Sequence, residues 1–420
     1  MSGGIFLLVR RSLRQHAFST IITVLAVGLA SGLTMSVFSI QQQTREAFSG
    51  GDVGFDAVLG ARGSQLQLVL NTVFHLETSP GNIPWSVYEK LKEDTPGIRL
   101  AIPYATGDNY FGYRIVGTST ELFSDFEYQK GQKFRFVGDG RSFEDGYAEA
   151  VVGSYVAEQL GISVGDHIHP SHGVNYAEGS EHEDEYTVVG ILEPTNSPSD
   201  RVVWIPIEGI FHMDGHVLKG AGEHYEHHGT HAIPEEHKEV SAVMLSFSSP
   251  TLGMNLNQQI NMIGKEYTLA FPIGRVMLEL FDKIGWVNRI FELVAYLVVL
   301  VSGAAILASI YNTINERRRE FAILRALGAR RRTVFSAIVL EAATIAALGS
   351  VLGWLFYGVI LFSASYAVRK ETGVVLEVFM LHPSLYLTPI GMTLLGAITG
   401  IVPAYKAYAT DVAENLIPHS

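Results

Sequence analysis

The chain has 420 residues, of which 47% are hydrophobic and 17% charged, and its mean hydropathy is +0.21. This composition argues against a purely soluble protein and excludes disorder, which requires low hydrophobicity. The formal net charge of −12 disfavours nucleic-acid binding, which usually needs a basic surplus. The absence of cysteine excludes a disulfide framework, a thiolate metal site and a cysteine nucleophile.

Four stretches without charged side chains are long enough to cross a bilayer, which needs about 20 helical residues. They lie between Arg14 and Arg45, from Leu293 to Asn315, from Ala342 to Val368 and from Val378 to Tyr405. Around them we predict transmembrane helices over residues 17–41, 288–314, 334–364 and 384–405. A cleaved signal peptide is the alternative for the first stretch. Its apolar core from Phe18 to Ile40 exceeds the roughly 7–15 residues of a signal peptide, so we interpret it as an uncleaved anchor.

Basic residues set the predicted orientation, because they are enriched on the cytoplasmic side. They precede the first helix, cluster between the second and third, and follow the fourth, so four spans place them all on one side. Both termini are then cytoplasmic. The prediction is an α-helical membrane protein with four transmembrane helices and a large mixed α/β extracytoplasmic domain between helices 1 and 2. Its non-membrane segments are 1–16, 42–287, 315–333, 365–383 (a short external connection) and 406–420.

Three pairs of glycines have the GxxxG spacing that allows close packing of membrane helices. The pairs are Gly28/Gly32, Gly349/Gly353 and Gly396/Gly400. Ordinary glycine usage is the alternative interpretation.

The predicted external domain is acidic, with 34 acidic and 16 basic residues between Gln41 and Ile284, which suits cations or basic partners. β-Branched runs predict strands over 147–153, 186–192, 201–207 and 240–247. Helices are expected from Ile83, over 154–160 up to Gly161, and over 260–290 towards the membrane.

Eleven of the 15 histidines fall in two acidic insertions, 167–185 and 212–237. Imidazole and carboxylate without thiolate suit Zn²⁺, Cu²⁺ or Ni²⁺, so we predict a metal site with Zn²⁺ as its main candidate. A solvated insertion that binds no metal is the alternative. The candidate ligands are His167, His169, His172, His182, His212, His216, His224, His227, His228, His231 and His237.

Three catalytic motifs are absent from the sequence. It contains no H-E-x-x-H, no G-x-S-x-G and no P-loop G-x-x-x-x-G-K-[ST]. We therefore predict no catalytic residue and no ATP site in this chain.

The predicted cytoplasmic segment 315–333 combines charge with an apolar face formed by Phe321, Leu324 and Leu327/Gly328. This pattern favours a docking surface over a purely basic membrane anchor. The Glu-Arg-Arg-x-Glu-x-x-x-Leu-Arg-Ala-Leu-Gly-Ala pattern that begins at Glu316 resembles the signature of MacB/FtsX/LolC-type ABC transporter permeases. Segments 151–168, 186–192 and 200–206 also look like the periplasmic domain of this family, so the resemblance covers most of the chain.

The resemblance implies a homodimeric, multi-pass permease of the bacterial inner membrane that works with two separate P-loop ATPase subunits. ATP-driven movement inside would be relayed to the external domains by mechanotransmission. The residues that match the signature, and are therefore expected at the ATPase contact, are Glu316, Arg318, Glu320, Leu324, Arg325 and Gly328. The chain departs from MacB itself by lacking a fused ATPase domain, and its His-rich insertions are not part of the general family pattern.

Several functions stay open at this point. The permease is either linked to a divalent metal or exports lipoproteins or hydrophobic compounds. An FtsX-like regulatory scaffold that transports nothing would instead hold an external protein partner. The signature argues against a metal sensor without an ATPase. Glu341, a carboxylate in the third membrane stretch, is expected to pair with Arg330, Arg331 or Arg332, or with a neighbouring helix, rather than to act on a substrate.

Overall fold

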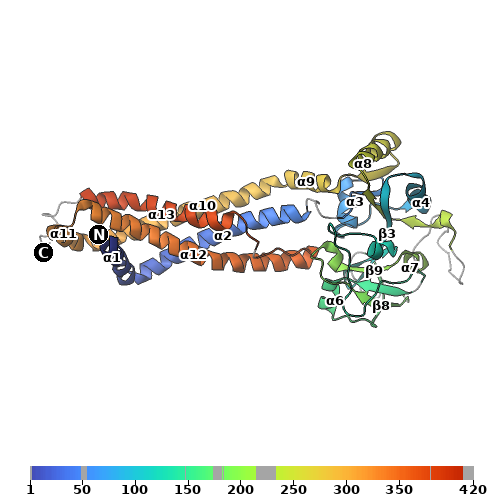
Figure 1. The fold of residues 1–420 in the computed structure, drawn as a ribbon, viewed down its shortest axis with the longest axis horizontal. Helices are drawn as coiled ribbons and strands as arrows, with labels where there is room; N and C mark the ends of the chain where they lie inside the picture. Colours follow the sequence, from blue (N-terminus) through green and yellow to red (C-terminus); the bar gives the residue numbers. More distant parts are fainter. Residues whose placement is uncertain are drawn as a thin grey trace. The chain divides into compact units, whose positions relative to one another are not determined.

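A computed structural model describes residues 2–48, 54–146, 148–173, 182, 184–213, 233–378 and 380–409. The chain forms two compact units (Figure 1). The first, called the helical unit, comprises Met1–Thr44, Ile284–Tyr366 and Leu376–Ser420. The second, called the α/β unit, comprises Arg45–Lys283 and Ala367–Val375.

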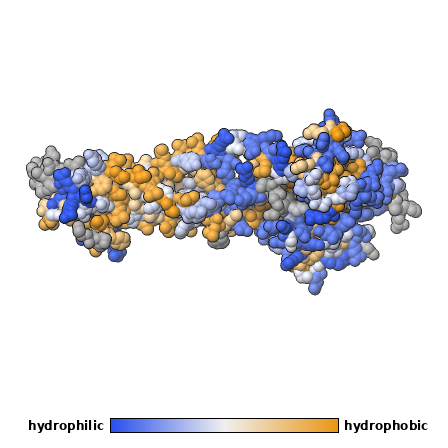
Figure 2. Space-filling model, turned by 45° about the horizontal axis from the view of Figure 1, so that its top comes forward, coloured by the Kyte–Doolittle hydropathy of each residue, from blue (hydrophilic) through white to orange (hydrophobic). Residues whose placement is uncertain are grey.

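Four long helices dominate the helical unit: α2 (Ala17–Phe48), α10 (Gly285–Glu316), α12 (Arg331–Thr372) and α13 (Ser384–Ala409). Each is long and apolar enough to cross a membrane. Hydrophobic side chains cover the middle of their visible surface, with hydrophilic ones towards the ends (Figure 2), as expected for helices that cross lipid. Two shorter helices lie at one end of this bundle (Figure 1): α1 (Ser2–Gln15) and α11 (Arg318–Ala326), which joins α10 to α12.

Helices α2 and α12 pack through their glycine pairs. A Cβ atom on Gly32 would lie 2.6 Å from Phe356 Cβ and 2.8 Å from the Gly353 carbonyl oxygen. A Cβ on Gly28 would lie 3.1 Å from the Gly349 carbonyl oxygen. The two backbones therefore approach more closely than any side chain would allow, and the predicted GxxxG packing is confirmed.

The third glycine pair brings α13 onto α12. A Cβ on Gly396 would meet Ala346 Cβ at 2.4 Å, and one on Gly400 would meet Ala342 Cβ at 2.7 Å. Small residues thus line both sides of this contact, which also confirms the prediction.

One sheet forms the centre of the α/β unit, in the order β12-β1-β11-β3-β4-β9-β5-β8-β6, with β7 pairing β3. Most pairs are antiparallel, and β4–β9 and β5–β8 are parallel. A second, two-stranded sheet pairs β2 (Ile83–Pro84) with β10 (Glu239–Val240). The strands of the large sheet are β1 (Ala57–Ala61), β3 (Ile98–Tyr110), β4 (Tyr113–Thr118), β5 (Glu149–Val152), β6 (His167–Ile168), β7 (Ser171–His172), β8 (Tyr186–Ile191), β9 (Val202–Pro206), β11 (Ala242–Phe247) and β12 (Tyr267–Ala270).

Both faces of this sheet are covered by apolar side chains. Successive residues of a strand point to opposite faces, and Val58 and Leu59 of β1 accordingly belong to two different hydrophobic cores. The covering elements include α3 (Gln65–Thr72), α4 (Trp85–Asp94), α5 (Glu121–Ser124), α6 (Ser154–Leu160), α7 (Ile207–His212), α8 (Pro250–Asn257) and α9 (Ile273–Lys283), with short helices η1 (Pro198–Arg201), η2 (Glu235–His237) and the π-helical η3 (Gln258–Gly264).

Most locally predicted elements are present, and two differ. The predicted strands correspond to β5, β8, β9 and β10/β11, and α6 ends at Gly161 with φ +69° as expected. The helix expected from Ile83 begins at Trp85, because Ile83 and Pro84 pair with β10. The single helix expected over 260–290 is wrong. The η3 turn ends at Lys265 with φ +56°, and the β-forming run that follows pairs with β1 as β12.

The last residues of α12 and those after them are built into the α/β unit. Arg369 donates a hydrogen bond to Glu158 at 2.7 Å and lies over the ring of Tyr155. Val374 is buried in the hydrophobic core of this unit, and Gly373 packs against the Ser197 carbonyl. One unbroken helix therefore begins at Arg331 in the helical unit and ends at Thr372 in the α/β unit.

Candidate functional site

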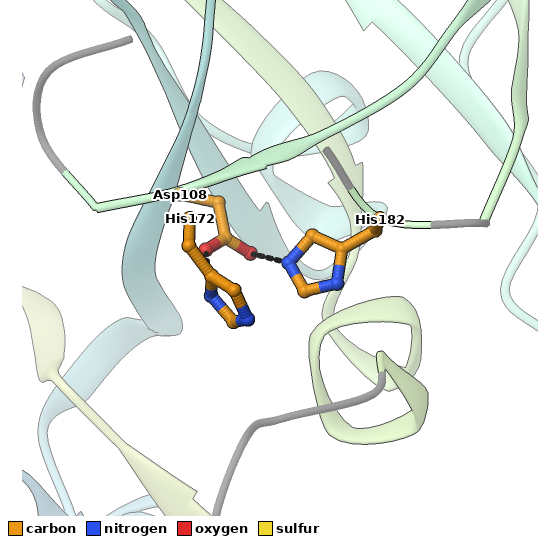
Figure 3. A group of neighbouring side chains, drawn as sticks. All are labelled: Asp108, His172 and His182. Carbon is orange, nitrogen blue, oxygen red and sulfur yellow. Dashed lines mark ion pairs between the residues drawn. The ribbon is translucent and has the colours of Figure 1, made fainter. Parts of the chain in front are cut away.

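Three side chains in the α/β unit form a cluster of the kind that binds metal: Asp108, His172 and His182 (Figure 3). Each offers one ligand atom, and these atoms all lie within 4.8 Å of one another. His172 Nδ1 is 3.4 Å from Asp108 Oδ1, and His182 Nε2 is 3.7 Å from Asp108 Oδ2. Each carboxylate oxygen thus faces one imidazole, and the two rings themselves are in contact, with their centroids 4.0 Å apart.

An irregularity in β3 positions this carboxylate. The register between β3 and β4 shifts between Thr106 and Asn109, and Asp108 instead lies directly opposite His172 of β7. Bulges of this kind redirect side chains and are frequent beside functional sites. The neighbouring Asn109, which is fully buried, donates hydrogen bonds to the carbonyls of Ser171 and Gly173 at 3.2 and 2.9 Å. The backbone on both sides of His172 is therefore held against β3.

The cluster has a buried side and an exposed side. The side chains of Asp108 and His182 are 1% and 3% exposed, whereas that of His172 is 47% exposed. The His182 backbone amide donates to the Pro170 carbonyl at 2.8 Å, which fixes it beside β7. Burial raises the pKa of the nearby Tyr186 phenol, with the charges of Asp184 and Asp108 adding to that effect. Tyr186 therefore stays neutral beside the cluster.

The other predicted histidine ligands lie elsewhere or outside the described residues. His167 and His169 lie 3.3 and 3.9 Å from Glu185, and His237 lies 3.8 Å from Glu236. His212 is exposed at the end of α7. The remaining five, His216, His224, His227, His228 and His231, lie outside the described residues.

Asp108 is absent from the sequence-based set. It stands alone in a largely apolar strand, 64 residues before His172, and no local motif marks it. Asp108 lies beside His172 because β3 pairs with β7. This pairing exists only in the folded sheet and cannot be read from a local sequence pattern.

The residues predicted for the ATPase contact lie on and around α11. Glu316, Arg318 and Glu320 are exposed, Leu324 and Arg325 are half-buried, and Gly328 is exposed with φ +95°. The residues of the predicted apolar face do not share one environment: some are packed against other helices and one is exposed. Phe321 and Leu324 line a small pocket with residues of α1 and α12, whereas Leu327 is 81% exposed and Ile323 44% exposed. The outward surface of α11 therefore carries charged side chains together with two exposed apolar ones, Ile323 and Leu327.

A buried polar network ties α11 to α1 and α12. Arg317 donates to Glu320 at 2.9 Å and to Ser12 of α1 at 2.5 Å, and Ser12 donates to Glu341 of α12. The Arg317 guanidinium lies 3.8 Å from the Glu341 carboxylate. The hydrogen bond from Arg317 lowers the pKa of Glu320, so this carboxylate stays ionised.

The expected pairing of Glu341 with an arginine of 330–332 is therefore wrong, and the alternative of a neighbouring helix is right. Arg332 precedes Glu341 by nine residues, which at 100° per residue places the two side chains on opposite sides of α12. Arg317, at the junction of α10 and α11, takes the place of the predicted arginines.

Comparisons with known proteins agree with this organisation. Residues 20–253, more than half of the chain, match the MacB-like periplasmic core domain family, and residues 292–412 match the FtsX-like permease C-terminal family.

Curated relatives match a shorter segment. The macrolide export ATP-binding/permease protein MacB of Nitrobacter winogradskyi is 32% identical over 129 residues, which are 31% of this chain and 19% of that protein. MacB of Bordetella avium is 27% identical over 125 residues, 30% of this chain and 18% of that protein. The chain therefore spans about a fifth of the length of these relatives.

Among solved structures, the periplasmic region of MacB from Actinobacillus actinomycetemcomitans is similar with a TM-score of 0.33 and 10% identity. The match covers 55% of this chain and 94% of that one.

Proposed function

Since the chain belongs to the MacB/FtsX-type family of ABC transporter permeases, we propose that it couples ATP hydrolysis in a separate P-loop ATPase subunit to a conformational change of its periplasmic domain. The protein is a multi-pass inner-membrane permease, and the α/β unit contains most of the segment that matches the MacB-like periplasmic core domain family. In this proposal it acts as a homodimer with both termini in the cytoplasm, and the chain itself catalyses no reaction.

The observation that carries the proposal is the continuity of α12. This helix begins four residues after Leu327, beside α11, and its final residues belong to the α/β unit. A continuous α-helix is a stiff element, because each turn is closed by backbone hydrogen bonds. Movement of its cytoplasmic end is therefore expected to be passed along the helix to its other end.

The outward surface of α11 supports the proposed contact with an ATPase. Arg318, Arg319 and Glu320 are exposed beside Ile323 and Leu327, which gives an apolar centre with a charged rim. Interfaces between proteins commonly combine these features. The inward surface supports the relay, since Arg317 joins α11 to Glu341 and Ser12.

The first test is association with an ATPase. The tagged full-length chain is purified from native membranes in mild detergent, and copurifying P-loop proteins are identified by mass spectrometry. We expect a P-loop ATPase whose hydrolysis rate depends on the permease. The change Leu327→Asp should abolish its copurification, whereas Leu381→Asp, at a site that is 89% exposed, should not. Equal copurification by both variants would exclude α11 as the contact.

The second test is transmission along α12. The chain has no cysteine, so Val164→Cys, at a site that is 49% exposed, allows one spin label per copy on the α/β unit. In the proposed homodimer, ADP–vanadate should change the label-to-label distance. Two glycines inserted after Tyr366 should remove that change without releasing the ATPase, while the same insertion after Leu381 should leave it. An unchanged response with the α12 insertion would contradict mechanotransmission.

The two remaining alternatives are an exporter and a regulatory scaffold that transports nothing. They are distinguished by whether a substrate stimulates the ATPase. Stimulation of the reconstituted ATPase by a lipoprotein or a hydrophobic compound would identify an exporter. A stable periplasmic protein partner without such stimulation would identify an FtsX-like regulatory scaffold.

A further inference from the structure

We propose that Asp108, His172 and His182 form a resident binding site for a Zn²⁺-class metal ion in the α/β unit. This site stands independently of the proposed coupling to an ATPase. It contains two of the eleven candidate histidines and adds a carboxylate that no sequence pattern marks.

The spacing of the three side chains fits a shared metal ion better than direct hydrogen bonds. The N–O separations of 3.4 and 3.7 Å exceed the roughly 2.7–3.2 Å of an N–H···O hydrogen bond. Two atoms bound to tetrahedral zinc at about 2.0–2.2 Å lie about 3.4 Å apart. The two N–O separations, each to a different oxygen of Asp108, are close to that distance, and one ligand atom from each of the three side chains lies within 4.8 Å of the other two.

The ligand set also has the right chemistry. Two neutral imidazoles and one carboxylate form a ligand set that zinc uses with water at the fourth position. Imidazole and carboxylate likewise suit Cu²⁺, whereas Mg²⁺ and Ca²⁺ favour oxygen ligands alone. The two histidines therefore select a transition-metal ion over the hard divalent cations.

Rigidity and burial favour a resident ion over a passing cargo ion. Asp108 is in the central strand β3, and the amide of Asn109 holds the carbonyls on both sides of His172. His182 is fixed through its backbone to Pro170. Ligands that are already in place cost little ordering entropy on binding, and two of the three side chains are almost fully buried. The exposed His172 gives the route of entry.

The structural effect of such an ion would be a cross-link. His172 and His182 are ten residues apart in the sequence, and Asp108 is on a different strand. Metal binding would fasten both ends of this stretch to β3. We therefore expect bound zinc to raise the thermal unfolding midpoint of the chain.

The test is zinc titration by calorimetry on the full-length chain in detergent, after removal of metal with EDTA. We expect one tight site per chain. Loss of a direct ligand should weaken binding by more than the roughly 10–100-fold typical of changes around the ligands. His172→Ala and Asp108→Asn should both do so. Since His172 is half exposed, its variant is expected to fold, and near-ultraviolet circular dichroism checks this.

Three further variants make the outcome decisive. His172→Cys supplies a thiolate ligand and should restore zinc binding. The double change His167→Ala/His169→Ala, in the pair of histidines beside Glu185, should leave the tight site intact. So should the change of His224, His227, His228 and His231 to Gln. Absence of zinc binding by the wild-type chain, or loss of the tight site only in the four-histidine variant, would overturn the proposal.

Discussion

The guanidinium of Arg317 lies 3.8 Å from the carboxylate of Glu341, and both side chains are more than 90% buried. Arg317 lies at the junction of α10 and α11, Glu341 lies in α12, and Ser12 of α1 bonds to both. Breaking a buried ion pair by removing one partner leaves an uncompensated charge, which typically costs about 3–5 kcal/mol. The pair therefore makes the junction of α1, α11 and α12 resistant to separation.

Glu341→Gln should accordingly lower the free energy of unfolding by about 1–3 kcal/mol, because the buried Arg317 then loses one of its two carboxylate partners and keeps only the more exposed Glu320. The double variant Arg317→Met/Glu341→Leu should recover part of this loss, since both buried charges are removed and the remaining carboxylate, Glu320, is exposed to solvent. Denaturant titration in detergent measures both. Glu279→Gln, in the exposed pair with Arg275, is the matched control and should change stability by less than about 0.5 kcal/mol. A similar small effect of both single changes would show that the buried pair does not hold the helices together.

The contact between α2 and α12 should depend on Gly353. A Cβ there would lie 2.8 Å from Ser31 Cβ and 3.2 Å from the Gly28 carbonyl oxygen, so Gly353→Leu must force the helices apart. Overpacking of this kind typically costs about 1–3 kcal/mol. We expect a lower thermal unfolding midpoint in detergent. Gly358→Leu in the same helix is the control, because a Cβ at Gly358 meets nothing within 4 Å. Equal midpoints for the two variants would contradict close helix packing.

His75 should make the α/β unit sensitive to acid. Its Nδ1 is buried, its ring is 5.8 Å from that of Trp204, and burial, with the charges of Arg114 and Arg201 adding, lowers its pKa to about 3. An unfolded chain binds a proton at this histidine below about pH 6.5, whereas the folded chain does so only near pH 3. Stability should therefore fall by about 1.4 kcal/mol per pH unit as the pH drops through that window.

The measurement is denaturant unfolding followed by tryptophan fluorescence between pH 7 and pH 4. His75→Asn removes the titrating group and suits the φ of +56° at this position, because asparagine tolerates positive φ. This variant should lose that part of the pH dependence, while His169→Asn, at an exposed site, should keep it. Identical slopes for wild type and His75→Asn would exclude His75 as the source.

Much of the fold follows from local patterns. Hydropathy locates four helices of sufficient length near the predicted residues, and the GxxxG spacing identifies their close contacts, because both signals lie within single helices. The elements β5, α6, β8 and β9 are likewise set by short β-branched runs and by Gly161 at a helix end. Where the local signal is ambiguous, as over 260–290, pairing of β12 with the distant β1 determines the structure.

The candidate sites depend on contacts between residues far apart in the sequence. Only some of their residues can therefore be predicted from the sequence. Histidine composition identifies His172 and His182 as candidates, but Asp108 joins them through a strand pairing between residues 64 positions apart. The partner of Glu341 is missed for a similar reason. Three arginines are nearer in sequence, yet Arg317 from the preceding helix junction reaches the carboxylate.

Asn109 provides a last prediction, because it positions one side of the proposed metal site without offering a ligand. Its side-chain NH2 group donates to the carbonyls that flank His172, and its side-chain oxygen Oδ1 accepts from the Gly112 backbone amide at 2.9 Å. Asn109→Ala should free the backbone around His172 and weaken zinc binding by roughly 10–100-fold, as is typical of groups that orient a ligand. Calorimetric titration of the full-length chain measures the change. Asn261→Ala removes an amide with a comparable backbone bond, to Leu269 at 2.8 Å, away from the cluster, and should leave zinc affinity unchanged. If both variants bind zinc as tightly as the wild type, the orientation of His172 does not depend on Asn109.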